Sequence, residues 1–256
     1  MRRIGLAVIL AVSLILAPLA AEAQAADQVR RIGYLSAPTL NPANVDDFRR
    51  GLREHGYVEG QNLIIEWRSA EGKDERLPAL AAELVKLKVE VIVTQGTAAA
   101  PSAKNATALT PIVFTFVADP VGMGLIVSFA RPGGTITGVS SFTLDLTGKR
   151  LELLKEAVPS LKAVALLTNP ANPASPSSIT EAQIAARRLG LDVRLVEVRD
   201  PAELEPALAS IARQHATGVA LVPGTFLLQY RNLIAELAMN AGYRCWAGTA
   251  PWPKAS

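Results

Sequence analysis

The sequence predicts an α/β protein with two Rossmann-like lobes, each built on a parallel β-sheet and joined to the other by a hinge. Three observations support this fold class. Short apolar runs alternate with helix-period segments from Arg30 onward, the same order of elements starts again at Lys162, and a stretch rich in Gly, Thr and Ser, 133–148, lies between the two series. Strands that alternate with helices form right-handed βαβ units, and these pair as parallel strands.

The first series contains apolar strands and amphipathic helices in strict alternation. The predicted strands span 29–35, 62–67, 89–94 and 112–117, and the predicted helices span 45–55, 75–87 and 97–108. Gly56 follows the first helix, at a position where a glycine commonly ends a helix in the left-handed conformation.

The second series repeats the first. Its predicted strands span 163–167, 192–198 and 218–222, and its helices span 179–189, ended by Gly190, and 201–214, which Asp200 caps. Three pairs of segments correspond in the same order: SAPTLNP with TNPANP, REHGYVEGQNLIIEW with RRLGLDVRLVEV, and VIVTQGT with VALVPGT. Between the series, 136–142 has strand character and 149–157 helix character. We therefore expect a first lobe over 26–140 and a second lobe over 141–242.

The first 25 residues are typical of a signal peptide. A basic start, an apolar segment over 4–20 and two overlapping A-x-A sites over 21–25 follow one another. The alternative is a retained membrane helix, but no cluster of stop-transfer charges follows. No cysteine lies near the cleavage sites, so we expect an exported, periplasmic protein without a lipid anchor.

Composition excludes several classes of function. The chain has 26 basic and 23 acidic residues, and without Arg2, Arg3 and Glu22 these become 24 and 22, a net charge of +2 with no concentrated basic face. Nucleic-acid binding therefore receives no support. The single cysteine cannot form an internal disulfide, and the two histidines, His55 and His215, lie far apart, so neither a disulfide nor a metal site is expected.

Polar loops follow several of the predicted strands. In parallel α/β sheets, ligands bind outside the carboxyl ends of the strands. Free backbone N–H groups at the start of a helix suit a carboxylate or another anion, whereas the carboxylate of Asp119 would suit a cation such as an ammonium group. The alternative is that these polar residues only cap helices. The loops are 36–42, 95–97, 119–120, 169–172 and 224–225.

Motifs of enzymes are missing from the sequence. The segment GMGLIV, 122–127, lacks the third glycine of a dinucleotide-binding loop, and no G-x-S-x-G, P-loop or H-E-x-x-H motif occurs. Asp119 has no nearby histidine and no second carboxylate at a comparable strand end. We expect a protein that is not an enzyme and needs no cofactor.

Three motifs resemble one family of proteins. They are GYVEGQN at 56–62, ADPVG at 118–122, and the segment from ARPGG to GVSS at 130–141. With RRIGYLS, DERLPALAAELV and VIVTQGT, they resemble the solute-binding proteins of ABC-type transporters, in particular the tryptophan/tyrosine-type group, over residues from about Arg30 to about Gly242. The resemblance implies the type I periplasmic binding protein fold.

The resemblance also implies a function. Such a protein captures a small solute, for example an amino acid, between its lobes and delivers it to an ABC permease, and we expect it to be a monomer. By position, the binding edge of the family corresponds here to Ser36, Gln95, Gly96, Thr97, Asp119, Asn169 and Thr225. The family commonly has an acidic residue near Gly224, and its absence here leaves the ligand class open.

The tail, 243–256, departs from the pattern. The first lobe has the strand PIVFTFVADP at this point of the series, whereas the tail contains two prolines and a Trp-Pro pair, which suit a buried strand poorly. We expect an incomplete second lobe that lacks its fourth strand, with residues 245–256 read out of frame. A periplasmic sensor, a truncated non-functional paralogue and an exported α/β enzyme are the alternative functions.

Overall fold

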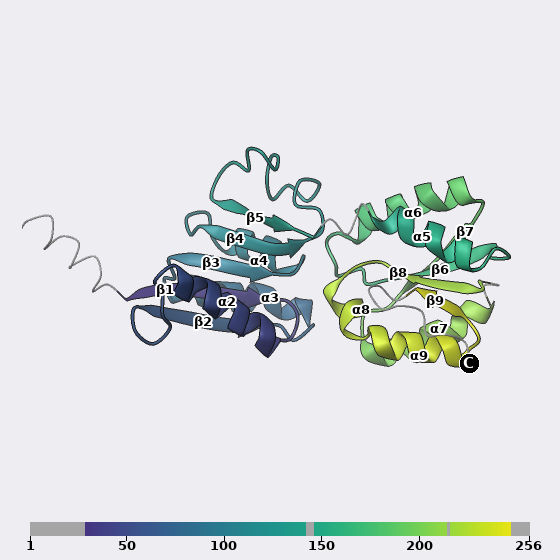
Figure 1. The fold of residues 1–256 in the computed structure, drawn as a ribbon, viewed down its shortest axis with the longest axis horizontal. Helices are drawn as coiled ribbons and strands as arrows, with labels where there is room; N and C mark the ends of the chain where they lie inside the picture. The colour runs from purple at the N-terminus through teal and green to yellow at the C-terminus, as the bar shows by residue number, and fades with distance from the viewer. Residues whose placement is uncertain (1–28, 142–145, 214–215, 247–256) are drawn as a thin grey trace, which may run out of the picture. The chain divides into compact units, whose positions relative to one another are not determined.

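The computed structural model describes residues 29–141, 146–213 and 216–246. The predicted signal peptide and residues 247–256 of the tail lie outside this part of the chain. Strands and helices alternate as predicted, and the strands form two separate parallel sheets (Figure 1). This confirms the predicted α/β class. Within the described residues, no helix is both long enough and apolar enough to cross a membrane.

The first sheet has five strands in the order β2-β1-β3-β4-β5. The strands are β1 (Arg30–Ser36), β2 (Leu63–Ser69), β3 (Val91–Gln95), β4 (Ile112–Val117) and β5 (Ile136–Ser140). Their register places Ile92 beside Ile112 and Gln95 beside Thr115. The segment with strand character between the two predicted series is therefore the edge strand of the first sheet, paired in parallel with β4.

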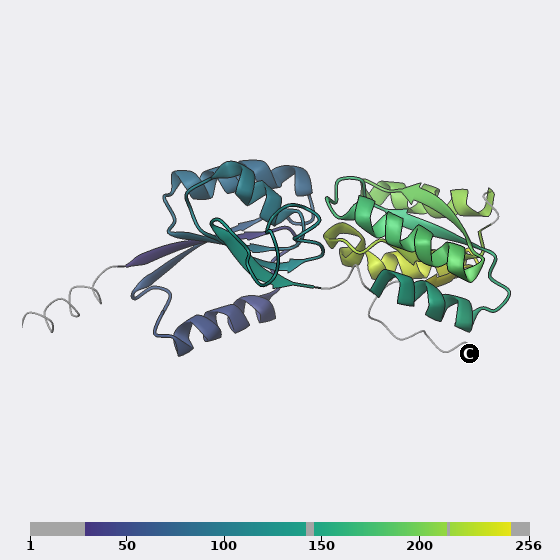
Figure 2. The ribbon, with the colours of Figure 1, turned by 90° about the horizontal axis from the view of Figure 1, so that it is seen from above.

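Helices follow the strands of the first sheet. They are α2 (Pro42–Glu54), the 3-10 turn η1 (Asp74–Arg76), α3 (Leu77–Lys86) and α4 (Ala99–Ala106). In Figure 2, α3 and α4 lie along one side of the sheet. Their buried residues, such as Leu84 and Ala103, share a core with Leu35, Ile92 and Phe114 of the strands. Strand residues facing this core alternate with residues on the opposite face, as the pleat requires.

The second sheet has four strands in the order β7-β6-β8-β9 and is the smaller of the two. The strands are β6 (Ala163–Thr168), β7 (Asp192–Glu197), β8 (Gly218–Leu221) and β9 (Arg244–Trp246). The helices are α5 (Leu146–Ala157), α6 (Ser175–Leu189), η2 (Pro201–Glu203), α7 (Leu204–Arg213), α8 (Thr225–Gln229) and α9 (Arg231–Asn240).

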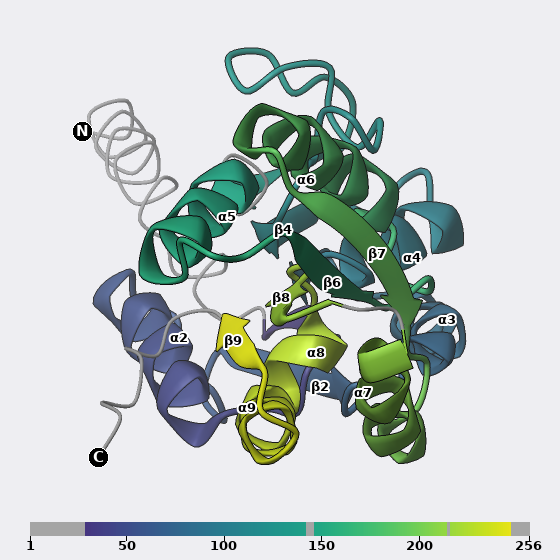
Figure 3. The same cartoon turned by 90° about the vertical axis from the view of Figure 1, so that its right-hand side faces the viewer.

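The central strand β6 is buried on both faces. Val164 and Leu166 pack in one core with residues of α5 and α6, whereas Ala165 and Leu167 pack in a second core with residues of α7 and α9. Figure 3 shows these two pairs of helices on opposite sides of the sheet. A continuous apolar run is what a parallel strand covered by helices on both faces requires.

The predicted helix ends agree with the structure at three positions. Gly190 ends α6 with a left-handed φ of 65°, and Gly56, with φ 83°, follows the end of α2. The Asp200 side chain accepts a hydrogen bond from the Ala202 amide and so caps η2. Helix α6 begins at Ser175, four residues earlier than predicted, because Pro176 stands in its first turn, where a proline needs no N–H partner.

The prediction that the second lobe lacks a fourth strand is wrong. Residues Arg244–Trp246 form β9, which pairs in parallel with β8 from Gly218 beside Arg244 to Ala220 beside Trp246. The physical reason lies in the position of the prolines. Pro251 and Pro253 come after these three residues, so every backbone N–H needed for the pairing is present.

Candidate functional site

The predicted site residues lie at or just after strand ends in both sheets. In the first sheet, Ser36 and Gln95 are the last residues of β1 and β3, and Asp119 follows β4 by two residues. In the second sheet, Asn169 follows β6 directly and Thr225 begins α8 after β8. The rule that parallel strands present their loops at one edge therefore places these residues as predicted within each sheet.

Ser36 and Gln95 are in contact. The Ser36 hydroxyl donates to Gln95 Oε1 at 3.1 Å, and the Tyr34 hydroxyl donates to the same oxygen at 3.2 Å. Burial raises the pKa of the Tyr34 phenol, so this group stays a neutral donor. The Tyr34 ring also contacts the Trp67 ring, with centroids 4.8 Å apart. The structure thus brings together side chains from β1, β2 and β3.

The loop after β1 is fixed by backbone hydrogen bonds. The Ala37 amide donates to the Gln95 carbonyl at 2.9 Å, and the Ala70 amide donates to the Ser36 carbonyl at 2.8 Å. The Ser69 hydroxyl donates to the Pro38 carbonyl at 2.9 Å. These contacts hold Ser36, which is fully buried, in one position relative to Gln95.

Gly96 is required by backbone geometry. Its φ is 94°, which side-chain-bearing residues rarely adopt, and a Cβ here would come 3.1 Å from the Ala37 Cβ. The next residue, Thr97, is buried, and its Oγ1 accepts a hydrogen bond from the Ala118 amide at 3.3 Å. Thr97 therefore links the end of β3 to the loop that carries Asp119.

Asp119 makes a local turn in the structure. Its Oδ1 accepts a hydrogen bond from the Gly122 amide at 2.9 Å, and its carbonyl accepts one from the Met123 amide at 3.0 Å. A side chain at Gly122 would collide with the carboxylate, because a Cβ would lie 2.1 Å from Oδ2. The contacts of Asp119 in the structure are thus those of a capping residue, which was the alternative to a ligand contact. Contact of Asp119 with a ligand stays a prediction.

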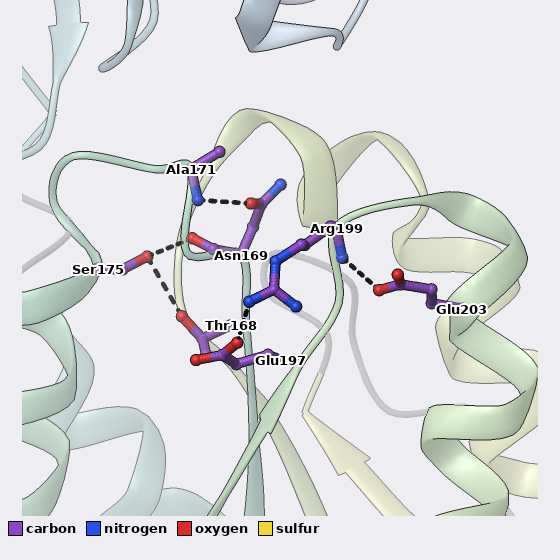
Figure 4. Close-up of polar contacts among 7 residues, drawn as sticks. All are labelled: Thr168, Asn169, Ala171, Ser175, Glu197, Arg199 and Glu203. Atoms are coloured by element: carbon purple, nitrogen blue, oxygen red, sulfur yellow. Dashed lines mark hydrogen bonds and ion pairs between the residues drawn. The ribbon is translucent and has the colours of Figure 1, made fainter.

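The second sheet carries a polar network at its strand ends (Figure 4). Asn169 Oδ1 accepts from the Ala171 amide at 2.8 Å, and Ser175 Oγ donates to the Asn169 carbonyl at 2.8 Å. After β7, the Arg199 guanidinium pairs with Glu197, while the Arg199 amide donates to Glu203 at 2.8 Å. This ion pair was not among the predicted residues.

Asn172 holds the loop before Thr225. Its Nδ2 donates to the Pro223 carbonyl at 2.9 Å, and its Oδ1 accepts from the Ala174 amide at 3.2 Å. Gly224 is close to this amide, because a Cβ on Gly224 would lie 2.6 Å from Asn172 Nδ2. The two Asn-Pro motifs of TNPANP thus give each of their asparagines a defined structural contact.

The family of the chain is decided by residues 31–240, which match the family described as ABC transporter substrate binding protein. The chain belongs to this family. The proteins of this family are solute-binding proteins rather than enzymes, and they are generally extracytoplasmic.

Relatives of this substrate-binding protein support the same assignment. It is 29% identical over 175 residues to a tyrosine-binding protein of Clostridioides difficile, covering 68% of the present chain and 50% of the relative. The chain thus spans about half the length of this curated relative.

Solved structures share the fold. An ABC domain of Streptococcus pneumonia in complex with L-Trp superposes with a TM-score of 0.74 at 21% identity, over 85% of this chain and 73% of the other. A leucine-binding protein of Thermotoga maritima superposes with a TM-score of 0.63 at 14% identity, over 84% and 61%. These similarities confirm the type I periplasmic binding protein fold.

Two residues of the first-sheet network, Tyr34 and Trp67, were missed by the sequence analysis. Both lie inside strands, where an aromatic residue is expected to pack in the core, and no local pattern distinguishes them. Tyr34 precedes the predicted Ser36 by two residues and so points to the same face of β1. This spacing was the one indication available from the sequence.

Proposed function

We propose that this substrate-binding protein captures an aromatic amino acid at the strand ends of its two lobes and delivers it to an ABC permease. The observation that carries the proposal is the polar network of Tyr34, Ser36 and Gln95 at the edge of the first sheet. The similarity to a tyrosine-binding protein favours an aromatic amino acid over other solutes.

The proposed contacts follow from the chemistry of an amino acid. Six of the seven predicted residues supply hydroxyl, amide and backbone N–H groups for a carboxylate, and the seventh, Asp119, supplies a carboxylate for the ammonium group. Asp119 is half-buried, and its Oδ1 accepts the hydrogen bond from Gly122. Its Oδ2 is the second oxygen, which would accept from the ammonium group. Closure of the lobes around a hinge would then complete the site.

Export is part of the proposal. The predicted signal peptide over 1–25 would direct the protein to the periplasm, where it would act as a monomer and meet the permease at the inner membrane. A fusion of residues 1–28 to a reporter that is active only after export tests this step. A fusion without export activity would contradict it.

Thermal-shift screening tests the ligand class. L-tyrosine and L-tryptophan should raise the melting temperature in a concentration-dependent way, because a ligand that binds only the folded state stabilises it by mass action. L-leucine, dipeptides and sugars are the comparison ligands. Stabilisation by sugars alone would overturn the proposal.

A further inference from the structure

The side-chain amide of Gln95 uses its oxygen and its nitrogen unequally in hydrogen bonding. Two hydroxyl groups, those of Tyr34 and Ser36, lie within hydrogen-bond distance of its Oε1, at 3.2 and 3.1 Å. No acceptor for its Nε2 is found among the residues that the structure describes, and Gln95 is only half-buried. The two N–H groups of the amide therefore stay available at the end of β3.

The direction of these bonds depends on the single hydrogen of Ser36. The Ser36 hydroxyl lies 2.8 Å from the Pro38 carbonyl as well as 3.1 Å from Gln95 Oε1. The Pro38 carbonyl oxygen can accept from both Ser69 and Ser36, so Ser36 shares its single hydrogen between this oxygen and Gln95 Oε1. With the Tyr34 hydroxyl as the second donor, Oε1 is the atom that faces the protein.

The neighbouring strand does not use the free N–H groups. Thr115 lies beside Gln95 in the register of β3 and β4, but its hydroxyl donates to the Thr94 carbonyl at 2.9 Å. The Gln95 backbone is also engaged, since its carbonyl accepts from the Ala37 amide. Only the two amide hydrogens are left for a molecule outside the described chain.

We propose that Gln95 is a specificity-determining residue that offers its two N–H groups to an oxygen of the ligand, with Tyr34 and Ser36 as positioning residues. This inference rests on the proposed function and deepens it. An amide held in this orientation presents hydrogens and no acceptor, so it favours a carboxylate or carbonyl oxygen and disfavours an ammonium group. The ligand's acid group, rather than its amine, then lies beside β3.

Three ligands of similar shape test this orientation by isothermal titration calorimetry. L-tyrosine has both charged groups, 3-(4-hydroxyphenyl)propionate lacks the ammonium group, and tyramine lacks the carboxylate. The wild-type protein should bind the first two and bind tyramine at least tenfold more weakly than it binds L-tyrosine. Hydrogen bonds to a charged group are worth roughly ten- to a hundredfold in affinity, so loss of the carboxylate should be at least this costly.

Variants at Gln95 test the contribution of its N–H groups separately from that of the neighbouring residues. Gln95→Glu keeps the acceptor for Tyr34 and Ser36 but removes the N–H groups, so affinity for the propionate should fall roughly ten- to a hundredfold. Gln95→Met has a similar length and no hydrogen bonds, and it should weaken the same ligand. Gln61→Glu, at an exposed position, adds the same charge as a control and should change nothing.

The positioning role has its own readout. In the wild-type protein, Tyr34→Phe and Ser36→Ala should each lower the ratio of the affinity for the propionate to the affinity for tyramine. In Gln95→Met, the same substitutions should have little further effect on this ratio. A structural role alone would alter stability but leave this ratio unchanged.

The outcomes distinguish the inference from the proposed function. If L-tyrosine binds but folded Gln95→Glu and Gln95→Met bind the propionate like wild type, the inference is overturned and the receptor function stands. If no aromatic ligand binds, the proposed function falls and the inference falls with it.

Discussion

Replacing Asp74 by asparagine should stabilise the protein at neutral pH and not at acid pH. Asp74 lies in η1 just before α3, and its Oδ1 is buried without a hydrogen-bond partner among the described residues. Burial, with a smaller contribution from the charge of Glu75, raises the pKa of the Asp74 carboxyl from 3.8 to about 6. The folded protein therefore disfavours the charged form.

The sign and size of the effect follow from this shift. Below pH 3.8 the carboxyl is protonated in both states, so the folded protein carries no penalty. As the pH rises to about 6, the unfolded chain loses the proton first, and the free energy of unfolding falls. About two pKa units at 1.36 kcal/mol each make this loss about 3 kcal/mol, complete above pH 6.

Urea unfolding at pH 3.5 and pH 7.5 measures the difference. The gain in unfolding free energy from Asp74→Asn should be larger at pH 7.5 than at pH 3.5 by up to about 3 kcal/mol. Comparing the two pH values cancels any constant effect of the amide. Glu75→Gln, which removes only the neighbouring charge, should give a smaller change of the same sign. An Asp74→Asn effect that is equal at both pH values would refute the reasoning.

Two further substitutions probe the irregular pairing of β4 and β5. Phe116 lies at the bulge with φ 57° and its side chain is 64% exposed, so Phe116→Gly should stabilise the fold by about 1 kcal/mol through relief of strain. Gly138→Ala should destabilise it by about 1–3 kcal/mol, because a Cβ would lie 2.0 Å from the Phe114 carbonyl oxygen. Urea unfolding measures both changes.

Each of these substitutions has a matched control. Phe129 is also exposed but has an ordinary φ, so Phe129→Gly should bring no gain in stability. Gly148 lies in α5, where an added Cβ would make an ordinary contact at 3.4 Å, and Gly148→Ala should be neutral or slightly stabilising. A loss of stability in Phe116→Gly, or none in Gly138→Ala, would contradict the account of the bulge.

Much of the fold could be predicted because parallel strands leave a strong local pattern. The run AVALL predicts β6 because every residue of a strand covered on both faces is apolar, and Gly190 marks the end of α6 because it adopts a left-handed φ. The pairing of β5 with β4 could not be predicted in the same way. It depends on a contact between Gly138 and Phe114 that no local pattern records.

The strand-end positions of the candidate residues were predictable, but the contacts between these residues were not. Ser36 and Gln95 lie 59 residues apart, and the sequence places both at strand ends without showing that they meet. Tyr34 completes their network from inside β1, where no local sequence pattern reveals its role. The prediction that the second sheet lacks a fourth strand relied on the prolines of the tail. These prolines follow the three residues that pair with β8, so they do not prevent the pairing of β9.

The most direct test of the central claim is calorimetric titration of the purified protein with L-tyrosine and L-tryptophan. A substrate-binding protein that captures an aromatic amino acid should bind one of them saturably, at one molecule per chain. A matching loss of affinity in Gln95→Met would connect this binding to the edge of the first sheet. Absence of saturable binding by either amino acid, in a protein shown to be folded, would contradict the account.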